Sequence, residues 1–468
     1  MNSLKITCLF LFIFFLLNPG IAQNNKDEIG YNINVKLEGF KNSKLYLGYH
    51  FGHKKFIIDT SFVDANNTAV FEGKNKLEGG IYLIILPSKK FFEIVIDQDQ
   101  HFYVETDTSD FIMSMKVKDS EENTRFNNYQ KNMRKLQVRM YDLKVRMNSN
   151  LNHNDSLAYL EKELKKYELE VKQLWKDEAL KNEGSLLGKL IKAMIEPEYP
   201  QNYTPKDSLE AVRYYKKHYF DNIDFSDERM LKTPILNSKI KNFLENYLDY
   251  HPDSIISLLN YVIAPMKKNN KVYKYMIMQI LSHFETNILF GYDEVFIYIA
   301  EKYFINDADF WKEPVYLSKI QNRVDVKKRI ITGQIAPDLK LKTINDEPLN
   351  LYGINSKMTI LYFWNPDCGH CQIVTPELHT VYEKYKEKGI IVFAVFTEGN
   401  KEEWNKYIHE KGISDWINVY DPDYTSKFKE VYDIMGTPIM FVLDENKRII
   451  AKKINPSALE KIINFFLK

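Results

Sequence analysis

Two cysteines, Cys368 and Cys371, stand three positions apart with Gly369 and His370 between them. This spacing lets both sulfurs meet on one helical turn, where they can form and break a disulfide reversibly. The free N–H groups and the dipole at the start of a helix favour a thiolate there. Cys368, nearer the start of the expected helix, is therefore the candidate attacking thiolate, and Cys371 is the candidate thiol that resolves a mixed disulfide.

The neighbours of this pair act on the thiolate in opposite directions. His370 adds a partial positive charge, which stabilises the reduced dithiol and makes the disulfide more oxidising. Asp367, directly before Cys368, is a negative neighbour that opposes ionisation. The sequence leaves the balance between these two effects open.

The flanking segments indicate how the pair is positioned. Residues 360–364 are a short apolar run of the kind that forms a buried parallel strand. Asn365, Pro366 and Asp367 are residue types that break strands and open helices. We therefore expect the cysteines at the junction between a central strand and the helix that follows it.

Three features of the C-terminal third occur in a fixed order. Residues 363–371 read Phe-Trp-x-x-x-Cys-x-x-Cys after the expected strand. Pro376 follows the second cysteine by five positions, at a point where it would kink the helix. A Gly-Thr-Pro tripeptide at 436–438 then precedes an apolar strand. Together these features resemble the thioredoxin superfamily, in particular the TlpA/ResA-like thiol–disulfide oxidoreductases of the bacterial envelope, over roughly residues 333–468.

The resemblance implies a thioredoxin fold with a redox-active disulfide between Cys368 and Cys371. It implies that Pro438 follows a cis peptide bond and faces the cysteine pair, which leaves the backbone of Thr437 free to pair with an extended substrate. Trp364 is expected to pack beneath the site, with an ordinary place in the core as the alternative.

No cofactor and no metal ion are expected. Covalent haem attachment needs a histidine directly after the second cysteine, where Gln372 stands. The two thiolates and His370 cannot easily converge on one zinc ion from adjacent positions.

One position departs from the family pattern. Many thioredoxins carry a buried acid on the strand directly before the Phe-Trp pair, and this chain has Tyr362 there. Glu398, in the loop after the next apolar strand, is a candidate replacement for that acid. A solvated loop acid is the alternative reading of Glu398.

Length and composition indicate the number of domains and argue against a nucleic-acid-binding protein. The chain has 468 residues, which predicts two or three domains, and its 44% hydrophobic residues are enough to form real cores. The formal net charge is +1, and nothing in the charge pattern indicates a nucleic-acid partner.

Residues 1–22 have the pattern of a secretory signal peptide, with a positive start, an apolar run and a small-x-small cleavage site. A retained membrane anchor is the alternative, although the run is short for a spanning helix. Cys8 would leave with the signal, so the Cys-x-x-Cys pair would supply the only cysteines of the mature chain. We therefore expect a protein of the periplasm or cell envelope without structural disulfides.

Patterning predicts a multidomain fold. Residues 23–113 show short apolar runs separated by Gly, Asn and Pro turns, which predicts a small antiparallel all-β sandwich. Residues 114–330 predict an α-helical domain, and residues 331–468 alternate strands and helices, as an α/β thioredoxin fold requires.

Two heptad seams between residues 121 and 177 predict an antiparallel helical hairpin within the helical domain. The first seam comprises Phe126, Tyr129, Met133, Leu136, Met140, Leu143 and Met147. Its methionines pack between the two helices in this interpretation, and a flexible groove for client proteins is the alternative.

These observations predict an exported thiol–disulfide oxidoreductase, a reductase or isomerase of envelope protein disulfides, that uses the Cys-Gly-His-Cys pair. The expected partners are cysteine-containing envelope proteins and a membrane donor of thiol reducing equivalents, with no nucleic acid; the oligomeric state is left open. One alternative is an envelope binding or scaffold protein, because residues 1–330 lie outside the thioredoxin-like part. The other is a thiol peroxidase with antioxidant activity, which needs Thr or Ser where Asn365 stands.

Overall fold

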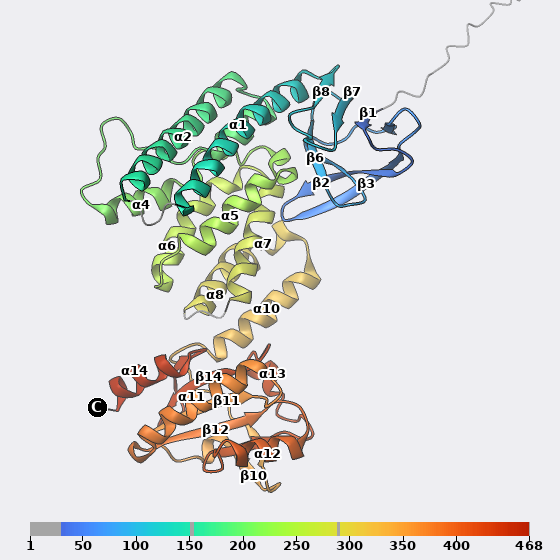
Figure 1. Ribbon diagram of the computed structural model, residues 1–468. Helices are drawn as coiled ribbons and strands as arrows, with labels where there is room; N and C mark the ends of the chain where they lie inside the picture. The colour runs from blue at the N-terminus through green and yellow to red at the C-terminus, as the bar shows by residue number, and fades with distance from the viewer. Residues whose placement is uncertain (1–29, 150–153, 288–290, 468) are drawn as a thin grey trace, which may run out of the picture. The chain divides into compact units, whose positions relative to one another are not determined.

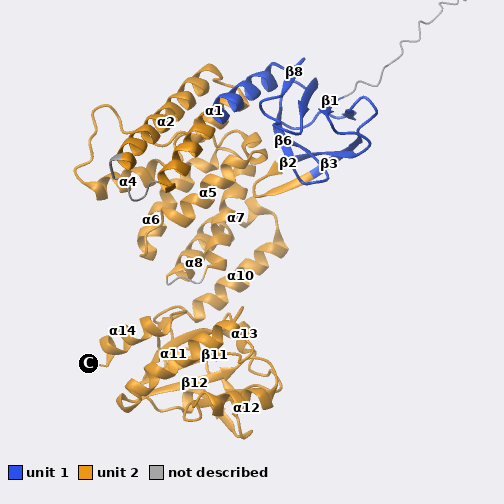
Figure 2. Ribbon diagram, in the orientation of Figure 1, with its two compact units in different colours: residues 1–48, 57–135 blue, residues 49–56, 136–468 orange. Residues whose placement is uncertain are grey.

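The computed structural model describes three stretches of the chain, residues 30–149, 154–287 and 291–467 (Figure 1). The predicted signal segment lies outside the described residues. The chain divides into two compact units, which are residues 1–48 with 57–135 and residues 49–56 with 136–468 (Figure 2). None of the helices within the described ranges has the length and apolar character needed to cross a bilayer.

The N-terminal region forms two four-stranded sheets, with the orders β4-β1-β7-β8 and β3-β2-β5-β6. The strands are β1 Tyr31–Glu38, β2 Lys44–Phe51, β3 Lys54–Phe62, β4 Thr68–Gly73, β5 Gly80–Ile85, β6 Phe91–Ile96, β7 His101–Asp107 and β8 Lys116–Lys118. Alternate residues of β1 and β7 are buried, which is the period-two pattern of a sheet with one face in a core.

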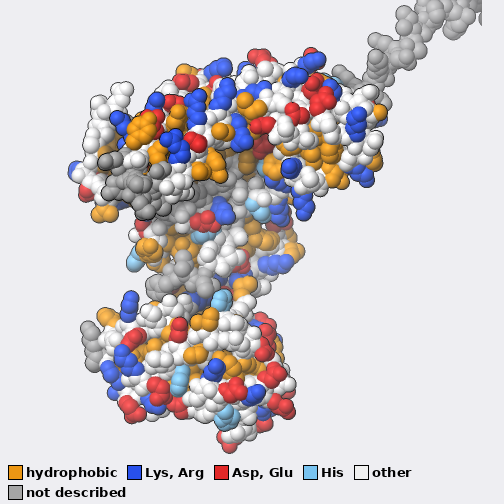
Figure 3. Space-filling model, in the orientation of Figure 1, with side chains coloured by type: hydrophobic (Ala, Val, Ile, Leu, Met, Phe, Trp, Pro, Cys, Tyr) orange, Lys and Arg blue, Asp and Glu red, His pale blue; other side chains and the backbone are white. Residues whose placement is uncertain are grey.

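Three details of this region differ from the sequence prediction. β1 pairs with β7 in parallel, so the antiparallel expectation is wrong for this pair. The reason is that β7 returns to the first sheet after β5 and β6 have joined the second, and a crossover sets its direction in place of a hairpin. β8 extends the sheet to Lys118, past the expected end at residue 113. β3 gave no alternating signal, because apolar side chains such as Ile57 and Phe62 are exposed in place of polar ones. Figure 3 shows hydrophobic side chains on the surface of the N-terminal region.

The tip of the β2–β3 hairpin, residues 49–56, belongs to the second unit. Gly52 donates its N–H to the carbonyl oxygen of Leu231 at 2.9 Å. Gly52 has a φ of +57°, and a Cβ at this position would lie 2.3 Å from the hydroxyl of Tyr275. Both the backbone conformation and the available space therefore require glycine.

The central region is helical, as predicted. Its helices are α1 Glu121–Ser149, α2 Asn154–Lys181, α3 Leu186–Met194, α4 Ser208–His218, α5 Pro234–Asn246, α6 Pro252–Ile263, α7 Asn270–Thr286, α8 Tyr292–Tyr303, α9 Ala308–Trp311 and α10 Pro314–Arg329, with short 3-10 segments η1 Glu228–Lys232, η2 Ala264–Lys268 and η3 Ile305–Asp307. Three of them begin with proline, whose fixed φ and missing N–H suit the first turn.

α1 and α2 are the two long helices of the predicted hairpin, and their connecting turn lies outside the described residues. Phe126, Tyr129 and Leu143 of the predicted seam are buried, and its remaining members are partly buried. The guanidinium carbon of Arg139 lies 5.8 Å from the ring centre of Tyr167, which places the C-terminal half of α1 beside α2. The seam methionines thus occupy the less exposed face of α1, as the packing interpretation expects.

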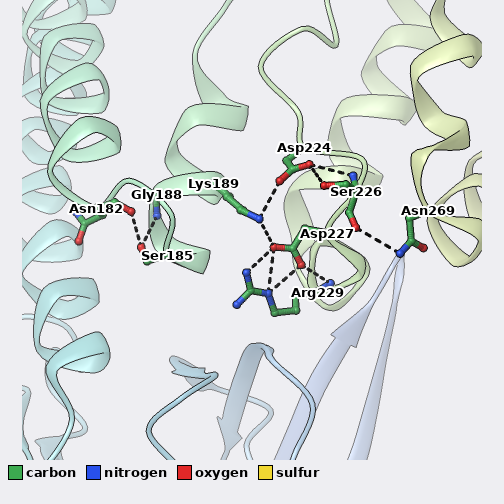
Figure 4. Close-up of polar contacts among 9 residues, drawn as sticks. All are labelled: Asn182, Ser185, Gly188, Lys189, Asp224, Ser226, Asp227, Arg229 and Asn269. Carbon is green, nitrogen blue, oxygen red and sulfur yellow. Dashed lines mark hydrogen bonds and ion pairs between the residues drawn. The ribbon is translucent and has the colours of Figure 1, made fainter.

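A cluster of charged side chains ties α3 to the segment around η1 (Figure 4). Lys189 Nζ lies 2.8 Å from Asp224 Oδ2 and 2.7 Å from Asp227 Oδ2, and Arg229 Nε donates to Asp227 Oδ1 at 2.9 Å. Burial would raise the pKa of Asp227, but hydrogen bonds from Arg229 and Lys189 hold it well below its ordinary value. Every charge in this cluster has a partner, which is the pattern of a structural tie.

The C-terminal region has a seven-stranded sheet in the order β10-β9-β13-β12-β11-β14-β15. Its strands are β9 Lys340–Thr343, β10 Pro348–Asn350, β11 Met358–Trp364, β12 Ile390–Phe396, β13 Ile417–Tyr420, β14 Ile439–Asp444 and β15 Ile449–Lys452. The helices are α11 Gly369–Tyr385, α12 Lys401–Glu410, α13 Phe428–Val431 and α14 Pro456–Phe466, with η4 Leu351–Gly353 and η5 Lys386–Lys388.

β11 lies inside this sheet, parallel to β12 and antiparallel to β14. All of its residues are buried. Tyr362 and Trp364 belong to the core that includes residues of α11 and α14, whereas Leu361 and Phe363 belong to the core on the other face. Because helices cover both faces, β11 reads as a continuous apolar run. The three-part multidomain fold class predicted from the sequence is confirmed.

Candidate active site

The cysteine pair lies where β11 passes into α11. Cys368 is the N-cap residue of α11 and has the extended backbone of such a position, with φ −82° and ψ 118°. Its N–H donates to the carbonyl oxygen of Asn365 at 3.2 Å, and Asp367 N–H donates to Asn365 Oδ1 at 2.8 Å. This tight turn leaves Cys368 partly exposed, while Cys371, one helical turn further, is fully buried.

Both cysteines are free thiols in this structure. The Cys368 thiol donates to the carbonyl oxygen of Thr437 at 3.2 Å. The Cys371 side chain acts on the pKa of Cys368, so the two sulfurs are neighbours. The structure therefore brings together the pair and Thr437, which lies 69 positions further along the chain than Cys368.

The two thiols differ in acidity. Burial alone would raise the pKa of Cys368, but hydrogen bonding with the side chain of Thr437, with Cys371 and with the backbone N–H group of His370 brings it below its ordinary value. Burial raises the pKa of Cys371 to about 11. The partly exposed sulfur is thus the better thiolate, and the buried sulfur stays protonated at neutral pH.

The peptide bond between Thr437 and Pro438 is cis, as the resemblance implied. One part of that expectation needs correction, because the Thr437 backbone is not entirely free. Its carbonyl oxygen already accepts the Cys368 thiol in the reduced protein. A substrate strand that uses this carbonyl has to replace that contact.

Trp364 satisfies both of the readings offered for it, because it lies in the core and that core contains Cys371. Its ring is fully buried and lies 6.3 Å from the ring of Tyr362, with an angle of 12° between the planes. Among the described residues its indole Nε1 has no hydrogen-bond partner.

Tyr362, at the position where many thioredoxins carry a buried acid, forms a neutral hydrogen-bonded pair with Thr375. The hydroxyl of Tyr362 lies 3.0 Å from Thr375 Oγ1, and both residues are fully buried. Burial raises the pKa of Tyr362, so its hydroxyl stays protonated. Glu398 forms an exposed ion pair with Lys429 at 2.6 Å, which fits the solvated loop acid and leaves no sign of a replacement base. Sequence reasoning missed Thr375, since a threonine in a helix carries no distinctive signal.

His370 is exposed and lines a cavity of about 690 Å³ beside the pair. Most of the lining is apolar, and it includes Ile373, Pro438 and Ile454. Glu285 of α7 also lines this cavity, so the helical region contributes to its wall. The cavity thus lies next to Thr437 and Pro438, the residues on either side of the cis peptide bond.

One group of side chains in the described ranges has the composition of a metal site. His379, Glu383 and Asp415 place ligand atoms within 4.8 Å of one another. Lys386 Nζ lies 2.7 Å from Glu383 Oε1 and 3.7 Å from Asp415 Oδ2. An ammonium group therefore already lies beside the two carboxylates that a metal would need.

Each of the three regions matches a known protein family. Residues 355–449 match the family described as Thioredoxin-like. Residues 167–326 and 31–126 match two families described as domains of unknown function, DUF5106 and DUF4369 respectively.

Thiol-disulfide oxidoreductase ResA of Oceanobacillus iheyensis is 27% identical over 139 residues, which are 29% of this chain and 71% of that protein. The thioredoxin-like protein YneN of Bacillus subtilis is 28% identical over 118 residues, 24% of this chain and 65% of that protein. A solved domain of a possible thiol-disulfide isomerase from Cytophaga hutchinsonii is 41% identical, covers 29% of this chain and 93% of that one, and has a TM-score of 0.28.

The family match lies within the α/β region, whose Cys-x-x-Cys helix start and cis proline meet at one site. The chain therefore belongs to the thioredoxin superfamily, as a TlpA/ResA-like thiol–disulfide oxidoreductase that carries two further regions of unknown function.

Proposed function

We propose that this protein is exported and exchanges disulfides with cysteine-containing proteins of the cell envelope through Cys368 and Cys371. The observation that carries the proposal is the asymmetry of the two thiols. Cys368 is partly exposed and has a lowered pKa, whereas Cys371 is buried and has a pKa of about 11. That asymmetry suits an attacking thiolate and a resolving thiol.

The exchange proceeds in two displacements. The Cys368 thiolate attacks one sulfur of a client disulfide, so the client S–S bond breaks and a mixed disulfide forms. The other client sulfur leaves as a thiolate and takes a proton from solvent. Cys371 then loses its proton and attacks the Cys368 sulfur, which releases the first client sulfur and leaves a disulfide between Cys368 and Cys371. The client gains two electrons, and a dithiol donor, which we propose lies in the membrane, restores the reduced pair.

The contacts of Asn365 favour disulfide exchange over peroxide reduction. A peroxidase of the related branch would need a hydroxyl at this position. The side chain of Asn365 instead accepts the N–H of Asp367 at 2.8 Å and shapes the turn before Cys368. We therefore propose protein disulfides, and not peroxides, as the substrates.

Trapping of clients tests this function. A Cys371→Ala protein, expressed in its native host with residues 1–22 intact, should accumulate as mixed disulfides with envelope proteins through Cys368. The matched control, Cys368→Ser with Cys371→Ala, should trap none. Equal recovery of partners by the two variants, or no reducible adducts with Cys371→Ala, would refute the proposal.

Export has a test of its own. Mass spectrometry of the protein purified from an envelope fraction should find a chain that begins directly after Ala22. A protein recovered from the cytoplasmic fraction with its first 22 residues attached would contradict the proposed location.

A further inference from the structure

The loop between α13 and β14 carries the group that touches the attacking cysteine. The carbonyl oxygen of Thr437 accepts the Cys368 thiol, and Asp433 lies four residues earlier in the same loop. Asp433 is buried and has a φ of +56°, a left-handed conformation that is unfavourable for a residue other than glycine. The surrounding structure must hold Asp433 in place for this conformation to persist.

Two cations of α10, a helix of the helical region, take both oxygens of the Asp433 carboxylate. Arg323 Nη1 lies 2.5 Å from Asp433 Oδ1, and Lys327 Nζ lies 3.1 Å from Asp433 Oδ2. Arg323 Nη2 also contacts Met435 Sδ at 3.4 Å. The same helix therefore holds the loop at two points, four and two residues before Thr437.

Acidic residues of two further helices also bind Arg323 and Lys327. Arg323 Nε donates to Glu285 Oε1 at 2.9 Å, and Lys327 Nζ donates to Asp293 Oδ1 at 2.6 Å. Glu285 belongs to α7 and Asp293 to α8, so the network reaches three helices. Lys327 is fully buried, and a buried charge that loses one partner is costly, so the cations have little freedom to move.

We propose that Arg323 and Lys327 are positioning residues, which hold the loop at 433–438 where Thr437 contacts Cys368 and thereby let the helical region control the reactivity of the cysteine pair. This inference rests on the proposed function, because it assigns a support to that same site. It gives the helical region a role beyond that of a spacer. The side chain of Thr437 is one of the groups that lower the pKa of Cys368, so a displaced loop should weaken the thiolate.

An Arg323→Gln variant of the full chain tests the inference. Two quantities are measured: the rate constant for reaction of Cys368 with a small aromatic disulfide, and the reduction potential of the pair against glutathione. We expect the rate constant to fall by about threefold to thirtyfold, the range expected when the coupling between linked sites is altered, and the potential to shift. Arg323→Lys, which keeps the charge but loses the fork that binds two acids, should recover part of both.

The matched control is Lys328→Ala on the same helix. Lys328 pairs with Glu301 at 2.5 Å, and both side chains are exposed, so this variant should behave as the wild type. Asp433→Asn combined with Arg323→Gln should lower the rate constant by less than the product of the two single effects, because the two changes share the interaction between Arg323 and Asp433. If Arg323→Gln does not fold, Arg323→Lys is compared with Lys328→Ala by the same two measurements.

The outcomes separate this inference from the proposed function. Variants of Arg323 and Asp433 that lose thermal stability but keep the wild-type rate constant and potential would show that the network only joins the regions, and the inference would fail. A wild-type protein that exchanges no disulfide would instead refute the proposed function.

Discussion

At the scale of single residues, position and not residue type makes the two cysteines different. Cys368 caps α11 and meets the N–H of His370, whereas Cys371 is one turn inside and packs in the core with Trp364. The helix start lowers the pKa of the first thiol and burial raises that of the second. A spacing of three residues is enough to cross from the surface into the core.

Alkylation should expose this difference. In a Cys368→Ser protein, Cys371 should resist iodoacetamide at neutral pH and react only as the pH approaches about 11, because burial holds its thiol protonated. In a Cys371→Ala protein, Cys368 should react readily at pH 7. Mass spectrometry of labelling rates between pH 6 and 11 measures both, with urea-unfolded samples as the reference. Equal rates for the two cysteines at pH 7 would contradict the assignment of roles.

The buried pair of Tyr362 and Thr375 gives a second prediction at this scale. Tyr362→Phe removes one partner of a buried hydrogen bond and leaves Thr375 Oγ1 without it, which should lower the free energy of unfolding by about 1–3 kcal/mol. Tyr424→Phe is the control, because its hydroxyl bonds to the exposed Glu430, and it should change stability by about 0.5 kcal/mol or less. Urea denaturation measures the free energy of unfolding of both variants. A Tyr362→Phe protein as stable as the control would show that this hydrogen bond does not stabilise the fold.

At the scale of elements, the sequence was informative where structure is local. The strand β11, the turn and the start of α11 follow from an apolar run and turn residues that are contiguous in the chain. β13, with only four residues, was missed because so short a run gives no periodic signal. Sequence reasoning also missed the parallel pairing of β1 with β7 and the ion pair between Arg323 and Asp433. Both join residues far apart in the chain, and no local pattern encodes them.

The tip of the β2–β3 hairpin gives a prediction about an element. Gly52→Ala should destabilise the protein, because φ is +57° there and the new Cβ would meet Tyr275. Gly39→Ala is the control, since Gly39 has a φ of +76° but no atom lies within 4 Å of its Cβ position. The control should cost about 1–2 kcal/mol from backbone strain alone. Thermal unfolding should show a clearly larger loss for Gly52→Ala, and equal losses would mean that the contact with Tyr275 yields without cost.

At the scale of the whole molecule, buried ion pairs join the helical region to the thioredoxin-like region within the second unit. Asp293 of α8 pairs with Lys327 of α10 at 2.6 Å and with Lys452 of β15 at 2.6 Å. All three side chains are almost completely buried. The carboxylate of Asp293 thus links the helical region to the sheet of the thioredoxin fold, and Lys327 also pairs with Asp433 at 3.1 Å.

Replacement of Asp293 and acidification should therefore act on the same link. Asp293→Asn removes the counter-charge of the buried Lys452 and one of the two acidic partners of Lys327, and it should lower the free energy of unfolding by about 3–5 kcal/mol. Glu301→Gln, which breaks an exposed pair, should change it by about 1 kcal/mol or less. Burial would raise the pKa of Asp293, but Lys452, Lys453 and Lys327 hold it well below its ordinary value. Because the folded-state pKa lies below the unfolded one, this stabilisation is complete above about pH 4 and is lost as the pH falls through the folded-state pKa. Urea titrations between pH 7 and pH 2 should show a steeper loss for the wild type than for Asp293→Asn, and parallel curves would mean that Asp293 does not carry the link.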